Sequence, residues 1–97
     1  MDALLIKADG TSRKVSPKNG TDFKLRELYK LLNCERIEVI YPYEYEKTGM
    51  ILICDEESKL NNRPANKVAT ITMCKGSGKI YDFIAGDVIY CPTEMLK

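Results

Sequence analysis

One segment of the chain has the periodicity of a helix, and the other apolar residues come in short strings. Leu25, Leu28, Leu31 and Leu32 recur at helical spacing, with the charges of Lys24, Arg26 and Lys30 between them. This pattern predicts an amphipathic helix from about Lys24 to Asn33. The remaining apolar strings have the length of strands and are separated by turn residues. One helix among short strands restricts the chain to an α+β fold.

Strand patterns lie on both sides of this helix, and a second, short helix is expected near residue 66. Asn66 is a suitable N-cap for residues 67–73, although the β-branched residues there would also allow a strand. Strands are expected at residues 3–8, 11–15, 36–41 and 50–54, and a last strand, ended by Pro92, in the apolar segments 81–85 and 88–91 that flank Gly86-Asp87. The predicted order is β-β-α-β-β-α-β, in a single α+β domain over residues 1–97. The amphipathic helix should cover one face of a largely antiparallel sheet.

Charge and hydropathy exclude several functional classes. The net charge is +1, so no general field attracts nucleic acid. Residues 1–30 carry seven cations and four anions, an excess that would suit a phosphate or simply form a solvated face. No apolar run approaches the roughly 18 residues needed to cross a bilayer. The N-terminal residues do not have the pattern of a signal peptide, so a cytoplasmic location is expected.

Cysteine and histidine usage argues against common catalytic and metal chemistry. The four cysteines are 20, 20 and 17 residues apart and form no Cys-x-x-Cys pair, so they are expected to be free, buried thiols rather than zinc ligands. The chain has no histidine, which removes the usual general base near neutral pH. The acidic cluster Asp55-Glu56-Glu57 is interpreted as a solvated turn. We therefore expect no enzymatic activity and no cofactor.

Two loops contain residues suited to ligand binding. Lys75-Gly76-Ser77-Gly78-Lys79 resembles a phosphate-binding loop, but Met73 and Ile80 replace the first glycine and the final hydroxyl of that motif. Nucleotide hydrolysis is therefore disfavoured, while anion binding stays open.

Tyr41, Tyr43 and Tyr45 alternate in a loop and suit either nucleobase stacking or a protein interface. Asn66 is most simply a helix cap. The expected ligand-binding residues are Tyr43, Tyr45, Arg63, Asn66, Thr70, Lys75 and Lys79.

Several short motifs resemble a family of small domains of unknown function carried mainly by bacteriophages, plasmids and other mobile elements. They lie at residues 3–10, 15–23, 25–28, 66–70 and 84–88. The resemblance implies a mobile-element origin and brings no catalytic residues. Two functions then stay open. The first is an accessory protein that sequesters a nucleotide-like signal and blunts host defence from the host cytoplasm. The second is a protein-interaction module. A homo-oligomer is expected, because short sheets have edges that must be covered or paired.

Overall fold

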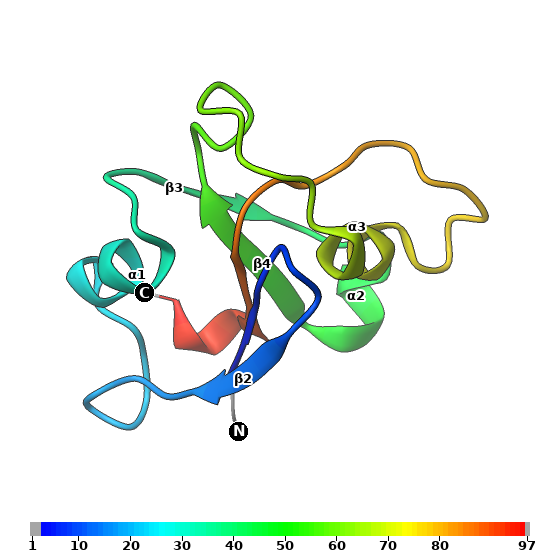
Figure 1. Cartoon of the computed structure of the whole chain (residues 1–97). Helices are drawn as coiled ribbons and strands as arrows, with labels where there is room; N and C mark the ends of the chain where they lie inside the picture. Colours follow the sequence, from blue (N-terminus) through cyan, green and yellow to red (C-terminus); the bar gives the residue numbers. More distant parts are fainter. Residues whose placement is uncertain (1–2, 97) are drawn as a thin grey trace.

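The computed structural model of the chain describes residues 3–96 as an α+β arrangement of five strands and four helical segments (Figure 1). The α+β class is confirmed. The elements are β1 (Ala3–Ile6), β2 (Ser12–Val15), α1 (Leu25–Leu32), β3 (Ile37–Ile40), α2 (Tyr45–Thr48), β4 (Met50–Asp55), α3 (Lys67–Cys74), β5 (Val88–Pro92) and the 3-10 helix η1 (Thr93–Met95).

The five strands form one antiparallel sheet in the order β2-β1-β5-β4-β3. The final strand, β5, therefore lies in the middle. Ile89 of β5 is the register partner of both Leu5 of β1 and Ile53 of β4. The uninterrupted apolar run of β4 is explained by its interior position between β5 and β3.

Both faces of the sheet are covered, so the prediction of one covered face was wrong. One hydrophobic cluster joins Ile51, Ile53 and Ile89 to Leu28 and Leu32 of α1. A second cluster, on the opposite face, joins strand residues to residues of α3; its buried members are Leu52, Cys54, Ala69, Met73, Cys74, Ile84 and Val88. The two helices thus lie on opposite faces (Figure 1).

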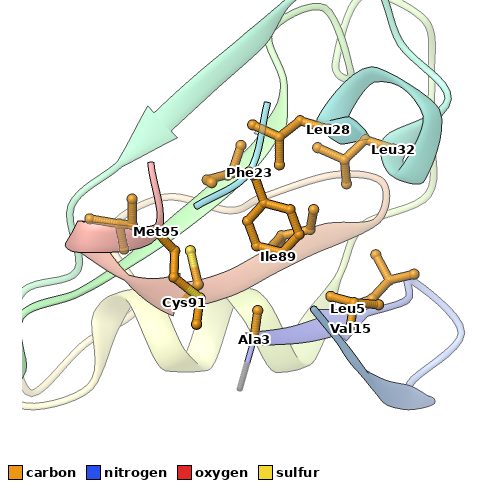
Figure 2. Packing of buried hydrophobic residues seen from close by; sticks show 11 residues of the cluster. Ala3, Leu5, Val15, Phe23, Leu28, Leu32, Ile89, Cys91 and Met95 are labelled. Atoms are coloured by element: carbon orange, nitrogen blue, oxygen red, sulfur yellow. The ribbon is translucent and has the colours of Figure 1, made fainter. Parts of the chain in front are cut away.

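Helix α1 occupies the segment that the leucine spacing predicts. Figure 2 shows the Phe23 ring between Leu28 and Leu32 of the helix and Ile89 of the sheet. The helix begins after Lys24, whose amide donates to Oε1 of Glu27 at 3.0 Å. It ends at Asn33, which has the left-handed backbone (φ 52°) that asparagine tolerates better than most residues.

Two segments have a secondary structure that differs from the one predicted from the sequence. Residues 81–85 form no strand beside β5. Instead Ala85 makes an isolated antiparallel bridge to Ala65, and the amide of Asn66 donates to the carbonyl of Ile84 at 2.7 Å. The segment with Tyr41, Tyr43 and Tyr45, expected to be a loop from residue 41 to 49, contains the single-turn helix α2; we call residues 41–49 the tyrosine loop.

Candidate functional site

Asn66 and Thr70 hold the framework together and are buried. The Asn66 amide group donates to the carbonyls of Ile6 and Gly86, both at 2.9 Å, and its oxygen accepts from the amide of Ala69 at 3.0 Å. The Thr70 hydroxyl accepts from the amide of Ile84 at 2.9 Å. The side chain of Asn66 is fully enclosed. The N-cap prediction for Asn66 is confirmed, and these contacts leave neither side chain directed at a ligand.

Arg63 is likewise engaged inside the fold. Its guanidinium pairs with the buried carboxylate of Asp55 at 3.0 Å and donates to the carbonyl of Asn33 at 2.7 Å, at the C-terminal end of α1. A Cβ added to Gly86 would lie 2.9 Å from its side chain, so the segments pack closely. Asp55 is only 4% exposed, so its interpretation as part of a solvated turn was wrong. Arg63 belongs to the same framework as Asn66.

The tyrosine loop and the Lys75–Lys79 loop, the other two regions expected to bind a ligand, lie next to each other. The amide of Tyr43 donates to the carbonyl of Met73 at 2.8 Å, which anchors the tyrosine loop to the C-terminal end of α3. Glu44 lies against Gly76, where an added Cβ would approach its side chain to 2.8 Å. Tyr43, Lys75 and Lys79 are all exposed beside this junction. The structure therefore brings the tyrosine loop next to the Lys75–Lys79 loop.

Tyr45 differs from the other tyrosines of its loop. Its hydroxyl lies 3.1 Å from the Thr93 hydroxyl, and its ring packs against the hydrophobic cluster below α1. The Tyr41 ring contacts Tyr45 edge to face, with centroids 4.8 Å apart. Tyr41 itself is 59% exposed. Tyr45 thus supports the loop, while Tyr41 and Tyr43 present their rings to solvent.

A groove of about 390 Å³ opens beside Tyr41, on the face of the sheet that carries α3. We call it the aromatic groove. Its floor contains Glu38 and Cys54, which are register partners on β3 and β4, and its walls carry Tyr41, Leu60, Tyr81 and Phe83. These four wall residues are each about half or more exposed. Tyr81 and Phe83 were missed as site residues because residues 81–85 were interpreted as strand.

The charge of the aromatic groove is mainly negative. Glu38, Glu56 and Asp82 line it together with one cation, Lys59. The Lys59 ammonium lies 3.0 Å from Asp82 and 4.3 Å from the centre of the Phe83 ring. Asp82 accepts hydrogen bonds from Lys59 and from the Phe83 amide. Both lower the pKa of Asp82, and the bond from Lys59 has the larger effect. Because Lys59 is paired with Asp82, Glu38 and Glu56 set the remaining charge of the groove.

The buried thiols are poor nucleophiles. Burial, aided by the Glu38 carboxylate, raises the pKa of Cys54 to about 12, and burial raises the pKa of Cys91 to about 11. Both therefore stay protonated near neutral pH. Cys34 is only partly buried, which departs from the expectation of four buried thiols. Within residues 3–96, no three His, Cys, Asp or Glu side chains form a group that could hold a metal ion.

Comparison with protein families identifies the domain. A family model described as a domain of unknown function, DUF3846, matches residues 1–95 of the 97-residue chain. The chain belongs to the DUF3846 family. This confirms the resemblance to a family of domains of unknown function, while its link to mobile elements stays a prediction. Comparison of this DUF3846 domain with curated proteins and with solved structures gives no match.

Helix length adds one constraint on this DUF3846 domain. Among residues 3–96 the longest helices have eight residues, and no helix is long and apolar enough to span a bilayer.

Proposed function

We propose that this domain is a non-enzymatic protein-interaction module that binds a basic, apolar peptide segment in the aromatic groove. The observation that carries the proposal is the grouping of Tyr41, Tyr81, Phe83 and Leu60 around one groove while they remain exposed. Aromatic side chains are enriched in protein interfaces, because they bury a large apolar area and keep a polar edge. A concentration of them on an exposed surface typically marks a binding site.

The charge of the groove supports a basic partner over an anionic ligand. Glu38 and Glu56 line the groove without a cation of their own there, since Lys59 is paired with Asp82. An arginine or lysine of a partner would gain attraction from these carboxylates and from the aromatic faces. A phosphate inside the groove would be repelled by the same carboxylates.

The absence of suitable catalytic groups supports a binding role. The chain has no histidine, and the thiol that lines the groove, Cys54, has its pKa raised to about 12. A nucleophile or general base for reaction near neutral pH would need a pKa closer to 7. Association into a homo-oligomer stays a prediction for this domain.

The groove can be tested with peptides of random sequence, about 12 residues long, selected for binding to the wild-type domain. We expect enrichment of arginine or lysine beside aromatic or aliphatic residues. Calorimetry with an enriched peptide should then show about 5- to 100-fold weaker binding for Tyr41→Ala and for Phe83→Ala, because truncating an aromatic anchor typically costs about 1–3 kcal/mol.

Tyr43→Ala provides the matched control, since Tyr43 is 62% exposed and does not line the groove. Its affinity for the peptide should stay within about twofold of wild type, the size expected for a side chain outside the contact. Selection that yields no consensus, or that enriches acidic peptides, would refute the proposed specificity.

A second candidate, sequestration of a nucleotide-like signal, is favoured by the position of Tyr43. Its exposed ring lies beside the loop that carries Lys75 and Lys79, which suits stacking of a base with its phosphates near the lysines. If the domain comes from a phage or another mobile element, as the sequence resemblance implies, such binding would blunt a host defence that signals through nucleotides.

The two candidates respond to different substitutions. For sequestration, titration with a panel of nucleotides should show binding that Tyr43→Ala weakens about 5- to 100-fold, because base stacking contributes roughly 1–3 kcal/mol. Lys79→Ala should weaken it more at low salt than at high salt, since screening suppresses an exposed ionic contact. Phe83→Ala should have no effect on nucleotide binding. If mass spectrometry of the denatured domain releases no nucleotide and the titrations are flat, this candidate is wrong.

A further inference from the structure

A second groove, separate from the aromatic groove, runs between α1 and the segment that follows β2. Two adjoining hollows form it, of about 790 Å³ and about 410 Å³. They lie next to each other, since both are lined by Lys18, Glu27 and Lys30. We call this the basic groove. Arg13 lies in the smaller hollow, and Arg26 lies in the larger one.

The positive charge of the basic groove is available to a ligand. Arg13, Lys18, Arg26 and Lys30 are all exposed, and none of the four forms an ion pair within residues 3–96. The groove also contains Glu27 and Glu35. These four cations exceed the two carboxylates, although the chain as a whole carries a net charge of only +1. A local excess of this kind attracts anions at short range.

Glu27 shapes the basic groove. One of its carboxylate oxygens accepts from the amide of Lys24 at 3.0 Å, and the other accepts from the amide of Lys18 at 2.9 Å. These two backbone hydrogen bonds lower the pKa of Glu27. The carboxylate thus fastens the segment after β2 to the start of α1, and Lys18 lines the same two hollows as Lys30. Its hydrogen-bonding capacity is directed at the backbone.

The larger hollow contains an aromatic ring as well. Tyr29 lines it, between Arg26 and Lys30 in sequence, and is partly exposed. A groove that combines separated cations with an aromatic side chain has the features of surfaces that bind single-stranded nucleic acid. In such surfaces the cations follow the phosphates, and the ring stacks on an unpaired base. A single phosphate would engage one of the two hollows, whereas a strand can occupy both.

We propose that the basic groove binds single-stranded nucleic acid, with Arg13, Lys18, Lys30 and Arg26 meeting successive phosphates and Tyr29 contacting a base. This role is independent of the aromatic groove. It requires no sequence preference, because contacts with phosphates carry no sequence information and stacking accepts every base.

The probe is a fluorescent oligothymidylate of about 15 nucleotides, within the range of known single-strand sites. Its affinity is measured by anisotropy between about 50 mM and about 200 mM salt. The test variant combines Lys18→Gln, Arg26→Gln and Lys30→Gln. The matched control combines Lys7→Gln, Lys47→Gln and Lys67→Gln, which removes the same number of exposed charges at positions outside both grooves and outside the Lys75–Lys79 loop.

We expect the groove variant to bind at least about tenfold more weakly at the lowest salt, and the control to stay within about threefold of wild type. The slope of log affinity against log salt should fall from roughly −3 for wild type to roughly −1 for the groove variant. Tyr29→Leu should also weaken binding, and the factor of this loss should be the same at every salt concentration, because stacking does not depend on counterion release. Thermal unfolding must show that each variant is folded.

Four results would overturn the proposal. They are equal loss of affinity in both triple variants, a salt-independent affinity, adenosine triphosphate binding as tightly as the oligonucleotide, and groove-dependent binding of phosphatidylserine vesicles or polyglutamate without binding of the oligonucleotide. The last two would assign the same cations to a free nucleotide, or to a membrane or an acidic protein.

Discussion

Replacing Asn66 with alanine is expected to destabilise the domain by about 3–5 kcal/mol, a large part of the roughly 5–15 kcal/mol that holds a typical domain folded. The Asn66 side chain is fully enclosed and satisfies the carbonyls of Ile6 and Gly86. Without it both buried carbonyls lose this donor, and a buried polar group left unsatisfied costs about 1–3 kcal/mol. The helix also loses the cap on the Ala69 amide, which contributes about 0.5–2 kcal/mol.

Urea unfolding of three variants would measure this effect. Asn66→Asp keeps an acceptor for the Ala69 amide but removes the donor, so it should also be strongly destabilised and would show that the donor matters. Asn61→Ala is the control, since Asn61 is exposed and its substitution should change stability by less than about 0.5 kcal/mol. A loss below about 1 kcal/mol for Asn66→Ala would contradict the assigned role.

Arg63→Met is expected to cost about 3–5 kcal/mol, because it leaves the Asp55 carboxylate buried without its cation. The Arg63 side chain is 25% exposed, which places the expectation toward the lower end of that range. The substitution also removes the donor to the carbonyl of Asn33 at the end of α1. Asp55→Asn and the double variant complete a thermodynamic cycle, and we expect a coupling energy of about 1–3 kcal/mol.

The exposed pair of Lys59 and Asp82 gives a control at the same separation. Its atoms are also 3.0 Å apart, but the two side chains are 48% and 56% exposed. Solvent screening should reduce its coupling energy below about 1 kcal/mol. If both cycles give the same coupling energy, the burial of Asp55 does not govern the strength of its ion pair.

Periodicity was sufficient to predict the elements that pack through their own side chains. The leucine spacing predicted α1, because helices of globular proteins bury a stripe of apolar residues. Asn66 predicted the start of α3, because its side chain caps the nearest free amide. The uninterrupted apolar run of β4 is typical of a strand buried on both faces, and β4 contributes side chains to both hydrophobic clusters.

The failures concern residues whose partners are distant in sequence. Asp55 resembles a solvated acid until Arg63 and the end of α1 are brought beside it. Residues 81–85 have strand composition, but Ile84 bonds to the backbone of Asn66 and to Thr70 instead of to a neighbouring strand. For the same reason the aromatic groove was not predicted. Tyr41 and Phe83 lie far apart in the chain, and only the fold places both beside one groove.

The central position of β5 makes the order of synthesis matter for folding. β1 and β4 each bond to β5 and not to each other, so the earlier residues alone can form only two separate pairs, β1 with β2 and β3 with β4. On the ribosome, the unpaired edges of β1 and β4 stay open until residues 88–92 emerge. Such edges readily pair with other chains. A translation product interrupted before residue 88 is therefore expected to aggregate, and the growing chain has most need of chaperones just before the last strand is made.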